Sequence, residues 1–243
     1  MAALGKVYLV GAGPGAADLI TVRGARLLAE ADVVLYDALV TPGMLALCAR
    51  AEKISVGKRS GQRSTAQALI NEQLVECAKK HALVVRLKGG DPMLFGRADE
   101  ELRALELEGI EVEVVPGITT AVAAAAATRQ PLTKRGVARS VAFFTSSTAP
   151  DQPDQRIGAP PALPETDTLV QYMGGREAAA TAERLLAEGR RPDLPVVVVE
   201  NCSRADERIL RLTLTDLARG LEPGHGPVLV MLGEALARRA HQR

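Results

Sequence analysis

Residues 84–97 read Val84-Val85-Arg86-Leu87-Lys88-Gly89-Gly90-Asp91-Pro92-Met93-Leu94-Phe95-Gly96-Arg97, and this stretch decides the fold. The apolar run at residues 83–87 predicts a strand, and a helical pattern follows from about residue 98 to 108. Between them, Gly89 and Gly90 accept positive φ angles and let a ligand approach the backbone. In an open α/β sheet, ligands bind at the carboxyl ends of strands. The loop is therefore either a ligand site or an ordinary strand-to-helix turn.

Short apolar strands alternate with helical stretches along the rest of the chain, which predicts an α/β fold. The pair Pro116-Gly117 breaks this alternation and predicts two α/β domains, residues 1–115 and 116–243. A cleft between two domains is the default place for an active site. Five prolines between residues 146 and 166 predict a surface loop.

Composition excludes several classes of protein. With 47% apolar residues in a chain of 243, the protein can bury a core and is not disordered. A net charge of +1 and 2% aromatic residues argue against nucleic-acid binding, and no apolar run reaches the roughly 18 residues of a membrane span. No signal peptide is recognisable, so we expect a cytoplasmic protein. The three cysteines and three histidines are scattered, so we expect neither disulfides nor a metal.

A second glycine loop, Gly11-Ala12-Gly13-Pro14-Gly15, follows a predicted strand at residues 6–10. Its spacing approaches a dinucleotide-binding fingerprint, but Pro14 interrupts it and the third glycine is missing. The chain also lacks the Walker A phosphate-loop pattern. Asp37 ends another buried-strand pattern at residues 32–36, so we expect it at the carboxyl end of a strand as well.

Taken in order, these loops resemble the motifs of uroporphyrinogen-III C-methyltransferases, within the tetrapyrrole methyltransferase superfamily. The first loop, with Leu35-Tyr36-Asp37-Ala38-Leu39-Val40, is similar to the family's first signature, and residues 85–97 are similar to the second. Further matching segments follow in the right order, across roughly residues 5 to 234: Val56-Gly57-Lys58-Arg59, Val115-Pro116-Gly117-Ile118-Thr119, Pro131-Leu132-Thr133, Tyr172-Met173-Gly174 and Val199-Glu200-Asn201. Each piece alone is weak, but the ordered set is specific.

The resemblance implies two α/β domains with S-adenosylmethionine in the cleft between them, and a homodimer. It also implies an enzyme that methylates uroporphyrinogen III twice, at C2 and C7, through precorrin-1 to precorrin-2. That product feeds the biosynthesis of sirohaem, cobalamin or haem d1. No metal, nucleic acid or membrane is expected as a partner.

By the same resemblance, residues of both predicted domains contact the cofactor. They are Pro14, Gly89, Gly90, Asp91, Leu94, Thr119, Thr120, Met173 and Cys202. Backbone groups at the two glycines suit the amino-acid part of S-adenosylmethionine, with Asp91 nearby as an acceptor. The sulfur of Cys202 is expected to be inert, with its backbone making the contact.

The resemblance assigns the proton chemistry and the substrate contacts as well. Asp37 would accept a proton and Lys58 would donate one. Uroporphyrinogen III carries eight carboxylates, which arginine side chains bind through two parallel hydrogen bonds. The expected substrate residues are Arg59, Arg97, Glu100 and Arg135, with Arg63 and Arg129 as further candidates.

Two stretches depart from the family motifs. Ser146-Ser147 stands where Thr-Gly-His is common, and Ala127-Thr128-Arg129-Gln130 stands in place of Tyr-Ala-Gly-Ile. Both stretches belong to the expected substrate side, so alternatives stay open. They are another precorrin methyltransferase of the superfamily, a ribosomal RNA methyltransferase of this fold, and a non-catalytic protein that binds S-adenosylmethionine or a nucleotide. The near-neutral charge and scarce aromatic residues argue against the RNA enzyme.

Overall fold

A computed structural model describes residues 4–57, 67–146, 162–222 and 224–238. The chain divides into two compact units, Met1–Thr120 and Ala121–Arg243, and both combine a β-sheet with helices. The α/β class expected from the sequence is confirmed, while the domain boundary expected between residues 115 and 116 stays a prediction. Across the described ranges, no helix combines the length and apolar character that crossing a membrane requires.

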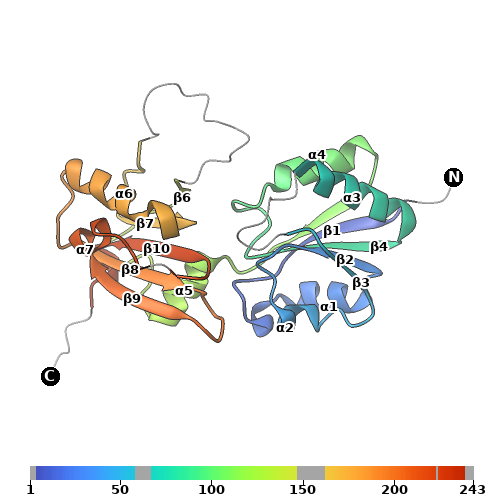
Figure 1. The fold of residues 1–243 in the computed structure, drawn as a ribbon, viewed down its shortest axis with the longest axis horizontal. Coiled ribbons are helices and arrows are strands. Elements are labelled where there is room, and N and C mark those ends of the chain that lie inside the picture. Colours follow the sequence, from blue (N-terminus) through green and yellow to red (C-terminus); the bar gives the residue numbers. More distant parts are fainter. Residues whose placement is uncertain (1–3, 58–66, 147–161, 223, 239–243) are drawn as a thin grey trace. The chain divides into compact units, whose positions relative to one another are not determined.

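The first unit is built on a parallel five-stranded sheet with the order β3-β2-β4-β1-β5 (Figure 1). Its strands are β1 (Lys6–Gly11), β2 (Val33–Tyr36), β3 (Glu52–Ser55), β4 (Leu83–Lys88) and β5 (Val112–Val115). Because the strands are parallel, all their carboxyl ends lie at one edge of the sheet.

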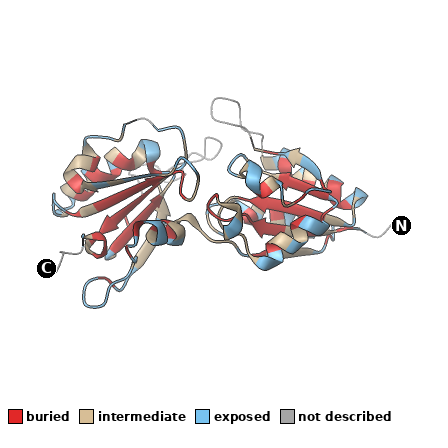
Figure 2. Cartoon of the chain, turned by 90° about the horizontal axis from the view of Figure 1, so that it is seen from below, coloured by how far each residue is buried: buried red, intermediate tan, exposed pale blue. Residues whose placement is uncertain are grey.

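Helices cover both faces of this sheet (Figure 1). One face packs against α3 (Gln67–Lys80) and α4 (Ala98–Leu107), and the other against α1 (Val22–Glu30) and α2 (Pro42–Leu45), which follow the 3-10 helix η1 (Ala17–Leu19). Thr21 caps α1, because its hydroxyl accepts the N–H of Gly24 at 3.1 Å. Figure 2 shows the strands as the most buried elements of each unit.

The second unit contains a mixed sheet with the order β6-β7-β10-β8-β9. Its strands are β6 (Val141–Thr145), β7 (Thr168–Tyr172), β8 (Pro195–Glu200), β9 (Arg208–Thr213) and β10 (Val228–Gly233). Only β6 and β7 pair in parallel; the pairs of β10 with β7 and β8, and of β8 with β9, are antiparallel. The sequence predicts these strands but not their directions.

Helices again lie on both faces of this second sheet. The helices α6 (Gly174–Ala187) and α7 (Leu214–Ala218) pack on one face, and α5 (Thr120–Thr128) with the 3-10 helix η2 (Glu234–Leu236) packs on the other. Thr213 caps α7. The cap is a capping box, in which the Thr213 side chain and Asp216 each bond the other's backbone N–H.

Candidate functional site

The predicted site residues of the first unit lie at the carboxyl edge of its parallel sheet. The strand register places Gly11 beside Lys88 and Tyr36 beside Leu87, so the loops after β1, β2 and β4 are neighbours. The helix that follows β1 and the helix that follows β4 pack on opposite faces of the sheet. Adjacent strands whose helices leave to opposite faces form the crevice in which open α/β sheets bind ligands.

The two glycine loops of this edge are joined by hydrogen bonds. The Gly13 N–H donates to the Gly90 carbonyl at 3.1 Å, and the Gly90 N–H donates to the Gly13 carbonyl at 2.8 Å. Gly90 has a φ of +70°, a conformation that residues with a Cβ atom rarely adopt. The Gly89 N–H donates to Asp37. Because both predicted glycines use their N–H groups within the protein, they can offer a ligand carbonyl oxygens.

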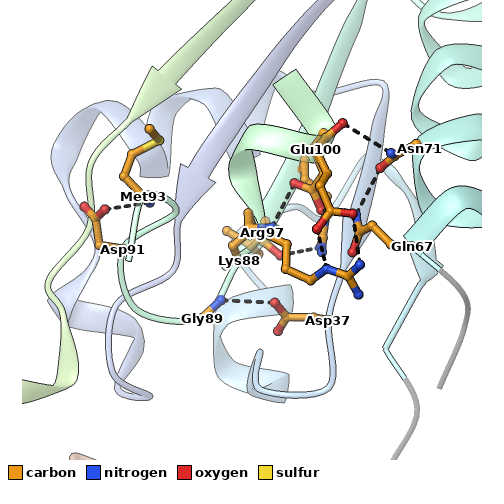
Figure 3. A network of polar contacts seen from close by, with 12 residues as sticks. Asp37, Gln67, Asn71, Lys88, Gly89, Asp91, Met93, Arg97 and Glu100 are labelled. Carbon is orange, nitrogen blue, oxygen red and sulfur yellow. Dashed lines mark hydrogen bonds and ion pairs between the residues drawn. The ribbon is translucent and has the colours of Figure 1, made fainter. Parts of the chain in front are cut away.

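Asp91 holds the loop after β4 in shape. One of its carboxylate oxygens accepts the N–H of Met93 at 2.8 Å, and the other accepts the N–H of Gly117 at 2.9 Å (Figure 3 shows the bond to Met93). The second bond ties this loop to the chain that follows β5. Each carboxylate oxygen has capacity for another hydrogen bond, so Asp91 can still accept from a ligand's ammonium group.

Asp37, at the end of β2, is half-buried and held by two backbone donors. Its Oδ1 accepts the N–H of Leu39 at 3.1 Å, and its Oδ2 accepts the N–H of Gly89 at 3.3 Å (Figure 3 shows the bond to Gly89). Gly57 packs so closely against this turn that a Cβ atom on it would lie 2.1 Å from the Ala38 nitrogen. The predicted residues Lys58 and Arg59, and the further candidate Arg63, lie outside the described residues.

Beside Asp37 and Gly89 lies a buried group of charges, the Arg86–Glu101–Lys88 triad. The Glu101 side chain is fully buried and accepts from Arg86 Nε at 3.1 Å and from Lys88 Nζ at 2.8 Å. Arg86 and Lys88 are two residues apart on β4, so their side chains lie on the same face of the sheet, which α4 covers. Burial, and then the neighbouring Arg86, lower the pKa of Lys88, while Glu101 and Asp37 act in the opposite direction.

The triad is absent from the sequence-based expectations, which treat residues 83–87 only as an apolar strand. A signal was nevertheless present. Arg86 and Lys88 alternate with Val85 and Leu87, and charged residues are almost never fully buried without a partner. A strand with charges on its inner face therefore predicts a buried acid on the helix that covers it.

Arg97 and Glu100, both predicted substrate residues, bind each other. The Arg97 guanidinium donates to both Glu100 oxygens, from Nε at 2.7 Å and from Nη2 at 2.9 Å (Figure 3). Each side chain is 42% exposed, so the pair is open to solvent. Arg97 has a φ of 53° and stands at the N-cap position of α4, without a side-chain capping bond.

The remaining predicted cofactor residues of the first unit lie on the same loops. Pro14 is buried in the loop after β1, and Leu94 is half-buried and donates its N–H to the Asp91 carbonyl at 3.3 Å. Thr119 and Thr120 are half-buried and follow β5. The structure therefore gathers the described first-unit predictions at one edge of one sheet.

In the second unit, Met173 and Cys202 lie at one edge of the mixed sheet. The strands β7 and β8 both run antiparallel to β10 and so run in the same direction, which places their carboxyl ends together. Met173 follows β7 and is 50% exposed. The hydroxyl of Tyr172, the preceding residue, accepts the N–H of Ala121 at 3.1 Å, so the start of α5 reaches this edge.

The structure does not bring Arg135 to that edge. Arg135 lies in an exposed turn closed by an isolated bridge between Lys134 and Ala138. Just before this turn, the Leu132 carbonyl accepts the Thr168 hydroxyl at 2.8 Å, at the start rather than the end of β7. Within the second unit, Arg135 therefore lies toward the opposite edge from Met173.

The Cys202 thiol is buried, and the inert role expected for its sulfur stays a prediction. The residue is 3% exposed, and burial together with the neighbouring Glu207 carboxylate raises the pKa of Cys202 to about 12. The thiol stays protonated at neutral pH, so it is a poor nucleophile and metal ligand. In the part of the chain that the structure describes, no three His, Cys, Asp or Glu side chains gather as metal ligands.

The sequence is similar to known proteins over most of its length. Residues 6–218 match the family model of Tetrapyrrole (Corrin/Porphyrin) Methylases. A siroheme synthase from Tolumonas auensis is 46% identical over 96% of this chain, and the match covers 50% of that protein. The chain spans about half the length of the curated relatives it matches.

Solved structures with the same fold are also similar in sequence. Two structures of uroporphyrin-III C-methyltransferase from Thermus thermophilus, the native form and a complex with S-adenosylhomocysteine, are each 40% identical to this chain. Each superposes with a TM-score of 0.81, and the match covers 95% of this chain and 93% of the other.

Proposed function

The chain belongs to the tetrapyrrole (corrin/porphyrin) methylase family, and from this we propose that it transfers methyl groups from S-adenosylmethionine to carbon atoms of uroporphyrinogen III. Two transfers, at C2 and C7, would give precorrin-2 by way of precorrin-1. The product would serve the biosynthesis of sirohaem, cobalamin or haem d1.

One observation carries the proposal. The Asp37 carboxylate accepts a hydrogen bond from Gly89. The next residue, Gly90, pairs with Gly13 of the other glycine loop. An acid and two glycine loops therefore meet at the carboxyl edge of a parallel sheet, where ligands bind in open α/β sheets. This arrangement occurs in a chain that is 40% identical to a uroporphyrin-III C-methyltransferase solved with S-adenosylhomocysteine.

The described residues fit the amino-acid part of S-adenosylmethionine. Its ammonium needs acceptors, which the Asp91 carboxylate and the Gly89 carbonyl supply; its carboxylate needs donors, which the Thr119 and Thr120 hydroxyls supply. We assign cofactor binding to Pro14, Gly89, Gly90, Asp91, Leu94, Thr119, Thr120, Met173 and Cys202. When bound, S-adenosylmethionine supplies an electrophilic methyl group on a positively charged sulfur.

Asp37 is the proposed proton acceptor. Once a pyrrole carbon has gained a methyl group, a proton must leave the tetrapyrrole before the ring system is neutral again. The Asp37 carboxylate is fixed by the Leu39 and Gly89 N–H groups and lies at the carboxyl edge of the sheet, where a base can reach a bound ligand. Lys58, which follows Gly57 in the chain, is the proposed proton donor.

Three arginines, Arg59, Arg97 and Arg135, are the proposed binders of the substrate's carboxylates, and Glu100, which binds Arg97, is the fourth proposed substrate residue. The ion pair between Arg97 and Glu100 limits how Arg97 can bind the substrate, because its guanidinium already binds a carboxylate. A substrate carboxylate must displace Glu100 or use the remaining N–H groups. Displacement is inexpensive, since an exposed ion pair contributes about 0–1 kcal/mol.

We also propose that the protein is a cytoplasmic homodimer. The proposal of a dimer rests on the family resemblance, and sedimentation velocity tests it. The cytoplasmic location is supported by the cysteines, since Cys48, Cys77 and Cys202 are all buried thiols without a disulfide. Reduced thiols of this kind are typical of a reducing compartment.

The proposed function can be tested by product mass. The protein is incubated without oxygen with S-adenosylmethionine and freshly reduced uroporphyrinogen III, and the tetrapyrrole is analysed by mass spectrometry. We expect a product that is heavier by two methyl groups, with an intermediate heavier by one at early times. An unchanged tetrapyrrole, in a protein shown by calorimetry to bind S-adenosylmethionine, would refute the proposal.

A further inference from the structure

The second unit contains a basic pocket of about 510 Å³ at the end of α5. Among the described residues that line it, four side chains are positively charged and none is acidic. The lining residues are Thr128, Arg129, Gln130, Pro131, Lys134, Arg211, Ala235, Ala237 and Arg238. Among the described residues, these four cations form no ion pair within 4.0 Å.

The wall of the basic pocket is built around Arg211. Its guanidinium donates to the Thr128 carbonyl at 3.3 Å and to the side-chain oxygen of Gln130. Gln130 is buried and donates in turn to the Leu236 carbonyl, so β9, α5 and η2 are tied together. Both acceptors of Arg211 are neutral, and a guanidinium has more N–H donors than these bonds use. Arg211 is therefore fixed in place with an uncompensated charge.

Arg129 occupies a backbone position that favours glycine. The N–H groups of Arg129 and Gln130 donate to the Ala126 and Ala125 carbonyls at 3.1 and 3.0 Å, which is the hydrogen-bond pattern of a Schellman motif. In this motif the residue after the helix adopts the left-handed conformation, and Arg129 has a φ of 55°. Glycine would adopt it without a steric penalty. The chain instead places an exposed arginine at this position, where it lines the pocket.

A simpler explanation accounts for part of this charge. Cations near the carboxyl end of a helix interact favourably with its dipole, and this explains the bond from Arg211 to Thr128. The effect fades beyond the last helical turn, so it does not explain why Lys134 and Arg238 face the same pocket. Four like charges around one concave surface create a positive potential that favours an anion between them.

We propose that the basic pocket binds a small organic anion with two or more carboxylate or phosphate groups. Its volume lies within the roughly 300–1,000 Å³ that small-molecule sites occupy, which is larger than a single phosphate ion needs. The anionic groups could belong to the proposed tetrapyrrole substrate or to a separate metabolite. The pocket itself does not depend on the proposed methyl transfer.

The pocket is distinct from the predicted cofactor residues of the same unit. Met173 lies near the start of α5, through the bond between the Tyr172 hydroxyl and the Ala121 N–H. The pocket lies at the other end, beyond Thr128. Because α5 has 9 residues, each rising about 1.5 Å, the two places are roughly 12 Å apart along the helix.

A pair of matched double variants tests the proposal. Arg129→Gly with Arg238→Gln removes two cations from the pocket, and glycine suits the left-handed position. Arg26→Gln with Arg103→Gln removes two exposed cations from α1 and α4 and serves as the control. Binding of tricarballylate, which carries three carboxylates, is measured by calorimetry at constant ionic strength.

We expect tricarballylate to bind the wild type and the control equally, and to bind the pocket variant at least about tenfold more weakly. Competition by the octacarboxylate uroporphyrin would identify the tetrapyrrole as the natural source of the anion, and simultaneous binding would identify a separate metabolite. No binding to the wild type, or equal loss in both double variants, overturns the proposal. A changed sedimentation coefficient in the pocket variant alone also overturns it, because the surface would then be an interface between copies of the chain.

Discussion

Asp37 is held in place by two backbone N–H groups, one on each carboxylate oxygen. Asparagine keeps one acceptor oxygen, so it can retain one of these two hydrogen bonds, and losing the other costs about 0.5–1.5 kcal/mol, which is too little to unfold the chain. We therefore expect Asp37→Asn to fold normally, to bind S-adenosylmethionine, and to lose about 10²–10⁴-fold in turnover. Steady-state methyl transfer and calorimetry measure the two effects. Glu106→Gln, which also replaces an acid by its amide but at an exposed position on α4, is the control. Full turnover by Asp37→Asn would show that Asp37 is not the base.

Arg97 is proposed to bind the tetrapyrrole and not S-adenosylmethionine, so its replacement should affect one ligand and not the other. Its ion pair with Glu100 is exposed to solvent, so Arg97→Ala should cost little stability. Loss of a charge-assisted contact of about 1.5–3 kcal/mol should lower kcat/KM for the tetrapyrrole roughly 10–100-fold. The dissociation constant of S-adenosylmethionine should stay within about twofold. If cofactor affinity falls instead, Arg97 supports the glycine loop and not the substrate.

Glu101 is the acid on which two buried cations depend. Replacing it with glutamine leaves Arg86 and Lys88 buried without a counter-charge. Breaking a buried ion pair in this way costs about 3–5 kcal/mol, so we expect Glu101→Gln to lower the free energy of unfolding by that amount. Chemical denaturation measures it, with Glu106→Gln expected to change stability by less than about 0.5 kcal/mol. Equal stability of the two variants would show that the triad contributes no net stability.

At the scale of elements, the sequence pattern predicts the strands of both sheets and most helix starts, because apolar runs and glycine loops are local signals. The loop from Gly89 to Arg97 is an example, since both its strand and its helix form where expected. The burial of Arg86 and Lys88 could not be predicted as directly, because it depends on Glu101, 13 residues beyond Lys88. Strand direction in the second sheet could not be predicted either, since an apolar run is the same in both directions.

Asp167 joins the starts of β6 and β7 and gives those elements a pH-dependent stability. Its carboxylate accepts from the Ser140 hydroxyl at 2.7 Å and from the Arg139 and Ser140 N–H groups at 2.9 and 3.0 Å. These bonds lower the pKa of Asp167 below its ordinary value of 3.8, the Ser140 hydroxyl contributing most. The folded state thus holds this proton less tightly than the unfolded state. The resulting stability is present above the unfolded pKa and is lost as pH falls through the folded value.

We therefore expect Asp167→Asn to melt at a lower temperature than the wild type at pH 7. The difference should shrink as the pH falls below 3.8 and the wild-type carboxyl gains its proton. Thermal melts from pH 7 to pH 2.5 measure this, with Asp18→Asn as an exposed control. A difference in melting temperature that stays constant over this range would show that the charge of Asp167 does not stabilise the strand starts.

At the scale of the whole molecule, the proposed cofactor residues divide between the two units. Pro14, the Gly89 loop and Thr119–Thr120 belong to the first, while Met173 and Cys202 belong to the second. A single motif does not predict this set, because each loop alone is as consistent with a turn as with a ligand site. The order of the motifs along the whole chain predicts it, because the motifs together cover the loops at the edges of both sheets. Lys58 and Arg59 stay predictions because they lie outside the described residues.

The central claim is transfer of methyl groups to carbon, and isotope labelling tests it most directly. The protein is incubated without oxygen with uroporphyrinogen III and S-adenosylmethionine labelled with ¹³C in its methyl group, and the tetrapyrrole is examined by ¹³C NMR. We predict two labelled methyl groups, each bonded to a ring carbon. A tetrapyrrole without label, or with label on a carboxylate oxygen or a ring nitrogen, would contradict it.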